Sequence, residues 1–201
     1  QPRPAGQSGP SGRTASQGQP GSQGQPAPVE DVGTRPLPDL RDPRFQLERE
    51  TLKLVVQQPA LVAPLTGDLG DNDFTHPTYR AVWRAVSDLG GPSAAPEPEV
   101  WVAKLRDAVA GDTSSQAGRA LNALVVEPVL AAGEPDAMYA VANVFRLQEL
   151  TAMRRIADLK SRLQRTNPVD EAAEYNRMFG ELVALESHRR NLRERAIGAT
   201  D

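Results

Sequence analysis

The feature that most constrains the fold of this chain is a pair of very long helical patterns with only about one residue between them. The first runs from about Pro135 to Thr166 and the second from about Pro168 to Arg195. At about 1.5 Å per residue, these helices would be roughly 48 Å and 42 Å long. A continuous helix through Pro168 would cost about 3 kcal/mol, because proline lacks the N–H and clashes with the preceding turn. The sequence therefore predicts a tight turn between two antiparallel helices.

The residues of that turn favour an abrupt start to the second helix. Asn167 can cap, Pro168 can take the first helical position, and Asp170 can place its carboxylate near the positive helix end. We expect Asn167 and Pro168 to be structural turn residues that set the register of the two helices.

The long helices should project beyond the rest of the fold. A compact unit of about 110 residues is only about 35 Å across, so helices of this length overhang it. We expect the start of the first helix to pack on the compact part through Met138, Val141 and Phe145. Farther out, its apolar residues need another partner, which the last helix can supply through a three- and four-residue repeat. That repeat comprises Tyr175, Met178, Leu182, Leu185, Arg189, Leu192 and Ala196.

Before the long helices, the apolar residues from Asp42 onward also recur with helical spacing, and no convincing alternating strand pattern is present. Proline marks most of the expected helix starts, where its fixed φ is suitable and its missing N–H is not needed. These starts are at Pro43, Pro59, Pro77, Pro98, Pro135 and Pro168. The predicted fold class is all-α, with a compact multi-helix subdomain followed by a protruding antiparallel helical hairpin.

Residues 1–40 differ in kind from the rest. They are nearly all Gln, Pro, Gly, Ser and Ala, and such a segment cannot offset its ordering entropy by burying apolar surface. We interpret it as a disordered linker that follows a folded part of a longer protein. The remaining chain divides into a compact subdomain over 41–150 and a hairpin over 151–201, whose first helix begins near 135.

Several functional classes lack support in the sequence. The net charge is −3, cysteine is absent, and only His76 and His188 supply imidazole. No Glu-x-x-His pair, the motif of helical di-iron sites, occurs, and neither does a glycine-rich phosphate loop. His76 precedes a proline, where a capping role is expected. No long apolar run suggests a membrane span. The chain, as given, is predicted to be non-catalytic, soluble and intracellular.

Three segments give the chain a family resemblance. "RDPRFQLERETLKLVVQQPALVAPL", "DFTHPTYRAVW" and "RTNPVDEAAEY", in this order and with long helices around the last, resemble the C-terminal helicase-binding domain of bacterial replicative DNA primase of the DnaG type, from an actinobacterial branch. The resemblance runs from about Asp42 to the C-terminus. The N-terminal domain of the replicative helicase has a similar fold and a similar "F...HP" segment, so it is the alternative family.

The resemblance implies a partner and a division of labour. The hairpin would dock on a DnaB-type replicative helicase and recruit primase to the replisome at the nucleoid. Priming chemistry, with its zinc and magnesium, would lie in upstream domains, and no cofactor is expected here. In some relatives the compact subdomain also receives the acidic tail of the single-stranded-DNA-binding protein. Arg44, Arg49 and Lys53 could serve it, although Glu48 and Glu50 interrupt that basic face.

The hairpin itself offers a candidate binding face. Phe179 and Val183 form a second apolar line on the last helix, beside the stripe that packs on its partner. The expected helicase contacts are Tyr175, Phe179, Val183, Arg189, Arg190, Leu192 and Arg193. Two alternatives stay open: both apolar lines could close onto the compact subdomain, or the basic helix end could bind single-stranded nucleic acid, although strong direct DNA binding is not expected.

Overall fold

The computed structural model describes residues 38–95, 97–110 and 116–198, and the predicted linker lies almost wholly outside them. The described residues form helices and connecting loops, which confirms the all-α prediction. The α-helices are α1 (Gln46–Gln57), α2 (Pro59–Val62), α3 (Pro77–Asp88), α4 (Pro98–Ala110), α5 (Gln116–Val126), α6 (Ala137–Leu163) and α7 (Ala172–Ile197). Short 3-10 turns are η1 (Pro43–Phe45), η2 (Ala63–Leu65), η3 (Asp71–Asp73) and η4 (Pro92–Ala94).

Helix α1 is the centre of the compact part. It contacts α2, α3, α4, α5 and α6, and its middle is buried on every side. The predicted apolar stripes supply this core: Leu52 and Val55 from α1, Tyr79 and Val86 from α3, and Trp101 from α4 are all buried. The Trp101 indole N–H also donates a hydrogen bond to the carbonyl oxygen of Val55 over 3.1 Å. Aromatic and aliphatic residues at helical spacing are thus packing residues.

Side-chain caps mark the starts of η1 and α3. Asp42 accepts a hydrogen bond from the Arg44 N–H at 2.9 Å and starts the η1 turn that leads into α1. His76 is fully buried and caps α3, since its Nδ1 accepts from the Thr78 N–H at 3.1 Å. With Nδ1 as an acceptor, Nε2 carries the proton and donates to the Pro38 carbonyl oxygen at 3.0 Å. The expected capping role of His76 is confirmed.

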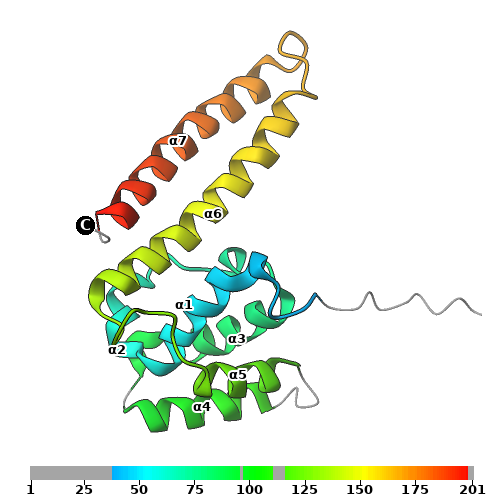
Figure 1. Ribbon diagram of the computed structural model, residues 1–201. Coiled ribbons are helices and arrows are strands. Elements are labelled where there is room, and N and C mark those ends of the chain that lie inside the picture. The colour runs from blue at the N-terminus through cyan, green and yellow to red at the C-terminus, as the bar shows by residue number, and fades with distance from the viewer. Residues whose placement is uncertain (1–37, 96, 111–115, 199–201) are drawn as a thin grey trace, which may run out of the picture. The chain divides into compact units, whose positions relative to one another are not determined.

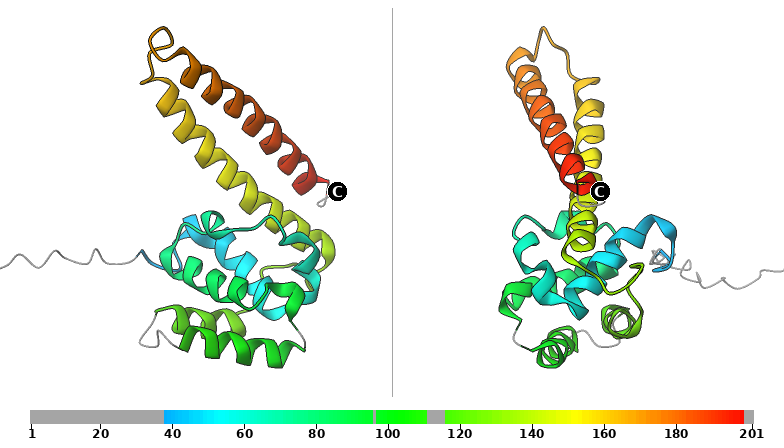
Figure 2. Two further views of the ribbon diagram at one scale, coloured as in Figure 1. Left: turned by 180° about the vertical axis from the view of Figure 1, so that it is seen from behind. Right: turned by 60° about the vertical axis from the view of Figure 1, so that its left-hand side comes forward.

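Helices α6 and α7 form the antiparallel hairpin, and the figures show it projecting from the five shorter helices with its turn at the far end (Figure 1 and Figure 2). Helix α6 lies across α1 at its base, whereas α7 packs chiefly on α6. Met178, Leu192 and Ala196 of α7 are buried, as the three- and four-residue repeat predicts. The hairpin is therefore an arm with its own seam of side chains.

Two predictions about the base of the arm need correction. Helix α6 begins at Ala137 instead of Pro135, because the Asp136 carboxylate caps it by accepting from the Tyr139 N–H at 2.8 Å. Phe145 was expected on the compact part, but it clusters with Ala152, Leu192 and Ala196. Helix α7 returns alongside α6 as far as Phe145, which it covers, while Met138, nearer the start of α6, stays exposed.

The start of α7 also differs from the prediction. The regular helix begins at Ala172, four residues after Pro168. Asn167 does cap, but it caps a single turn: its Oδ1 accepts from the Val169 N–H at 3.0 Å, and its carbonyl oxygen accepts from the Glu171 N–H at 2.9 Å. Glu171 then leaves helical geometry, with φ −119° and ψ 37°, and the chain bends there to bring α7 alongside α6.

Candidate partner-binding surfaces

The predicted hairpin residues divide between two sides of α7. Leu192 is only 3% exposed and packs in the seam with Phe145, and Tyr175 is half-buried. Phe179 and Val183 are 52% and 54% exposed. These two apolar side chains therefore form an accessible line on the outer side of the arm, whereas Leu192 belongs to its interior.

The arginines near the end of α7 also separate into two kinds. Arg189 pairs with Glu149 of α6 at 3.8 Å and with Glu186 at 3.1 Å, so it ties the two helices together. Arg195 lies over the Phe145 ring, with its guanidinium carbon 3.9 Å from the ring centroid. Arg190 and Arg193 are exposed and form no ion pair with any residue that the structure describes. Only these last two are available to a partner without breaking an internal contact.

Several exposed ion pairs lie on the two helices of the arm. Lys160 of α6 donates to Glu186 of α7 at 2.9 Å. This hydrogen bond holds the pKa of the Glu186 carboxyl below its usual value, and a hydrogen bond from Arg189 adds a smaller effect in the same direction. Arg177 does the same to the pKa of Glu174. These exposed pairs contribute little stability individually.

The turn at the tip is well hydrogen-bonded. Besides the bonds to Val169 and Glu171, the Asn167 amide donates to the Asp170 carboxylate. Pro168 and Val169 are exposed, Val169 by 82%. Asn167 and Pro168 thus have the structural role expected of them, although they shape a separate single turn rather than the first turn of α7.

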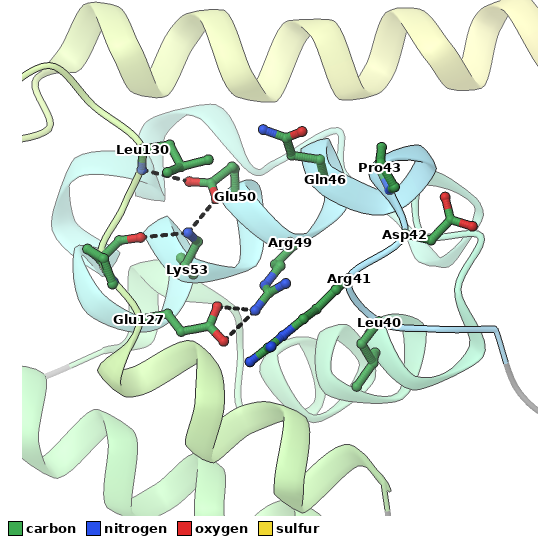
Figure 3. A pocket seen from close by; sticks show the side chains of 11 residues that line it. Leu40, Arg41, Asp42, Pro43, Gln46, Arg49, Glu50, Lys53, Glu127 and Leu130 are labelled. Atoms are coloured by element: carbon green, nitrogen blue, oxygen red, sulfur yellow. Dashed lines mark hydrogen bonds and ion pairs between the residues drawn. The ribbon is translucent and has the colours of Figure 1, made fainter.

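The predicted acidic-peptide residues lie in and around a pocket of about 410 Å³ on the compact part, shown in Figure 3. Arg49 donates to both carboxylate oxygens of Glu127. Lys53 is buried, pairs with Glu50, and donates to the Pro128 carbonyl oxygen at 2.7 Å. Glu50 in turn accepts from the Leu130 N–H at 3.0 Å. Arg49 and Lys53 therefore fasten the segment after α5 to α1 and are not free cations.

The accessible positive charge at this pocket comes from its mouth. Arg44 hydrogen-bonds to Asp42 at 2.7 and 2.9 Å, which lowers the pKa of that carboxyl. The Arg41 guanidinium has no partner within the described part of the chain. Leu40 lies beside it in the lining, and Leu130 lies on the opposite side of the pocket (Figure 3). Sequence reasoning missed Arg41 and the pairing acids, because Glu127 lies 78 residues from Arg49 and no local pattern joins them.

Among residues 38–95, 97–110 and 116–198, no cluster of three or more His, Asp and Glu side chains is placed to hold a metal ion. His76 is buried in its capping role, and His188 lines a small polar pocket beside Asp68 and Arg155. None of the described helices combines the length and apolar character needed to cross a bilayer.

Comparison with known proteins gives these surfaces a family context. The family model described as DNA primase DnaG DnaB-binding matches residues 48–178, so its match ends within α7, just before Phe179. The DNA primase of Mycobacterium leprae is 40% identical over 172 residues, which are 86% of this chain and 26% of that protein. The Streptomyces coelicolor primase is 34% identical over 169 residues. This chain thus spans about a quarter of the length of these curated relatives.

A solved structure extends the similarity to the fold. The helicase binding domain of primase from Mycobacterium tuberculosis is 36% identical, with a TM-score of 0.60, and the match covers 77% of this chain and 94% of that one. These findings decide between the two families that the sequence left as candidates. The chain belongs to the DNA primase DnaG DnaB-binding family.

Proposed function

We propose that this chain is the helicase-binding domain of a DNA primase and that it recruits primase to a DnaB-type replicative helicase through the α6–α7 hairpin. The observation that carries the proposal is the apolar line of Phe179 and Val183, exposed on a projecting arm beside the unpaired Arg190 and Arg193. The identity of the partner is supported by the DnaB-binding family of the chain and by its similarity to the mycobacterial helicase binding domain.

The chemistry of the arm suits a protein partner. Burying an exposed Phe or Val contributes on the order of 1.5–3 kcal/mol, and a projecting helix can enter an interface without disturbing the core beneath it. The arm from 146 to 198 carries eleven basic and eight acidic side chains, whereas the whole chain has a net charge of −3. A partner surface that offers carboxylates would complement it.

The proposal assigns the primer-synthesis chemistry of the full-length protein to other domains. RNA-primer synthesis, with its zinc and magnesium, would then belong to the roughly three quarters of the relatives' length that this chain does not cover. The domain itself would act in the cytoplasm, at the replisome, as a non-catalytic adaptor. This division is supported by the binding surfaces described above and by the family of the chain.

Substitutions on the exposed line test the proposal. We expect Phe179→Ala and Val183→Ala each to weaken binding to the cognate helicase about tenfold in calorimetry, because each removes apolar contact area. Deleting 167–201 should abolish co-sedimentation with the helicase. Val100→Ala is the control, since Val100 is 47% exposed on α4, in the compact part. Absence of binding by the unchanged chain would contradict the proposal.

A second candidate function is capture of an acidic peptide, such as the tail of a single-stranded-DNA-binding protein, at the pocket of Figure 3. The specific observation is the unpaired Arg41 in a pocket lining that also includes the apolar Leu40 and Leu130. An acidic peptide ending in apolar residues should bind there, and Arg41→Glu should weaken it at least tenfold. Arg106→Glu, an exposed change of the same charge on α4, should not.

Single-stranded nucleic acid is the competing occupant of the basic end of α7. Arg189 and Arg195 are already engaged within the arm, so two arginines remain to contact phosphates. Two phosphate contacts predict weak binding with a shallow salt dependence. Tight, steeply salt-dependent binding in fluorescence anisotropy would favour nucleic acid over the helicase.

A further inference from the structure

Gly180 is a glycine in the interior of α7, and the folded chain gives no reason for it. A Cβ placed there would meet no atom of the described residues within 4 Å. Gly180 also has no positive φ, whereas Gly90 and Gly91 of the described residues do. Glycine is the least favourable residue of a helix interior after proline. Glycine suits positions where another backbone approaches closely.

The exposed positions around Gly180 form a second seam. Steps of four and three residues lead from Asn176 through Gly180, Val183 and Ser187 to Arg190, and all five are exposed. At about 100° per residue, this outer seam lies roughly opposite Met178, which faces α6. Phe179 flanks it. Helix α7 thus has two helix-packing faces, one filled by α6 and the other open.

The spacing of the outer seam identifies the kind of occupant. An alternation of four and three residues, kept over about 21 Å, matches the ridges of another α-helix. Its side chains are small at Gly180 and Ser187, and interaxial distances shorten to about 8 Å where contact residues are small. Arg190, at the end of the seam, has no ion-pair partner among the residues described, so the facing helix should carry a carboxylate there.

We propose that the outer seam of α7 binds one α-helix of the replicative helicase, with the closest approach of the two backbones at Gly180. The facing helix has small or apolar residues along the seam and an acidic residue near Arg190. This inference rests on the proposed function and names the contact that decides which helix fits. The matched family model ends at residue 178, so most of the outer seam lies beyond it.

Substitution of Gly180 gives effects of opposite sign on stability and on binding. Gly180→Ala should raise the melting temperature by about 2–4 °C, because alanine favours the helix and its methyl group meets open space. The same variant should bind the cognate helicase about tenfold more weakly, and Gly180→Leu about a hundredfold more weakly, because each added carbon separates the two helices. A glycine with a purely structural role would not produce this pair of results.

The control lies on the other helix of the arm. Ala157→Leu adds comparable bulk at an exposed position of α6, away from the outer seam, so its binding should stay within threefold of the unchanged chain. Calorimetry and thermal unfolding are measured for all four proteins. If the unchanged chain binds and both Gly180 variants bind equally well, the outer-seam contact is overturned while the proposed function survives.

Two further outcomes would also overturn it. If Gly180→Ala lowers the melting temperature, the glycine serves the fold of α7 itself. If the unchanged chain sediments as a dimer that Gly180→Leu converts to a monomer, the outer seam belongs to a second copy of this chain. Failure of the unchanged chain to bind the helicase would refute the proposed function instead.

Discussion

Single buried carboxylates hold distant segments of the compact part together. Glu48, on α1, accepts hydrogen bonds from the Thr75 N–H at 2.8 Å and the His76 N–H at 3.1 Å, and also from the Thr75 hydroxyl. It is buried, so water cannot replace these bonds. One side chain of α1 therefore fixes the position where α3 begins.

Replacing Glu48 should be severely destabilising. Glu48→Ala leaves two buried N–H groups without acceptors, and we expect it to lower the free energy of unfolding by about 3 kcal/mol. Glu48→Gln keeps one acceptor oxygen and should lower the free energy of unfolding by less. Urea denaturation monitored by circular dichroism measures both variants. Glu99→Ala, at an exposed position of α4, is the control. Equal stability of Glu48→Ala and Glu99→Ala would contradict this role.

Because of Tyr79, the free energy of unfolding should change with pH in the alkaline range. Burial raises the pKa of Tyr79 to about 12, against an opposing effect of Arg49, and its hydroxyl donates to the Leu40 carbonyl oxygen at 2.7 Å. Its pKa in the unfolded chain is about 10. Because the folded state holds this proton more tightly, its contribution is complete below pH 10 and is lost as pH rises toward 12. Denaturation at pH 9, 10 and 11 should show this decline.

Tyr79→Phe provides the comparison for that pH series. It removes the titrating group and one hydrogen bond, so it should be less stable at pH 8 by about 1 kcal/mol but lose less stability on going to pH 11. Parallel pH profiles for the two proteins would show that other groups cause the decline.

At the scale of elements, the single turn at the tip is an independent capping unit. Asn167 supplies three of its hydrogen bonds, and the regular α7 begins only at Ala172. Asn167→Ala removes the two side-chain bonds and should cost about 1 kcal/mol. Hydrogen exchange should speed up at Val169 and Glu171 and stay unchanged at Leu192. Faster exchange throughout α7 would mean that the turn and the helix melt together.

At the scale of the whole described chain, a polar latch attaches the arm to the compact part. The Thr151 hydroxyl of α6 donates to Asp73 of η3. Arg154, one turn farther along, donates to the Asn72 carbonyl oxygen at 3.1 Å and to the Thr151 hydroxyl at 2.8 Å. This latch therefore ties the middle of α6 to η3 of the compact part.

Loosening the latch should widen the range of arm positions. The chain has no cysteine, so spin labels at Ser87→Cys on α3 and Ser161→Cys on α6 report one distance by pulsed electron paramagnetic resonance. We expect the distance distribution to broaden when Thr151→Val and Arg154→Ala are combined, and stability to fall by about 1–3 kcal/mol. Arg162→Ala, farther out on α6, is the control. An unchanged distribution would mean that apolar packing alone fixes the arm.

Much of this protein follows directly from the order of its amino acids, because the relevant physics is local. Proline at Pro59, Pro77 and Pro98 begins a helix through its own φ, and His76 caps through bonds to residues two positions away. The periodicity of α7 separates Met178 from Phe179 and Val183, which are buried and exposed as the pattern predicts. Such features depend on residues within about four positions of each other.

Which side chains are left for a partner depends instead on the tertiary packing. The sequence presents Arg49 and Lys53 as free cations, yet they meet Glu127 and the Pro128 carbonyl oxygen from 75 or more residues away. Phe145 clusters with Leu192 and Ala196 of α7, with Leu65 of η2 packed against the same cluster, because the returning helix reaches the base of the arm. Pairings of this kind depend on how distant helices close over one another, and no local rule of spacing or capping contains that information.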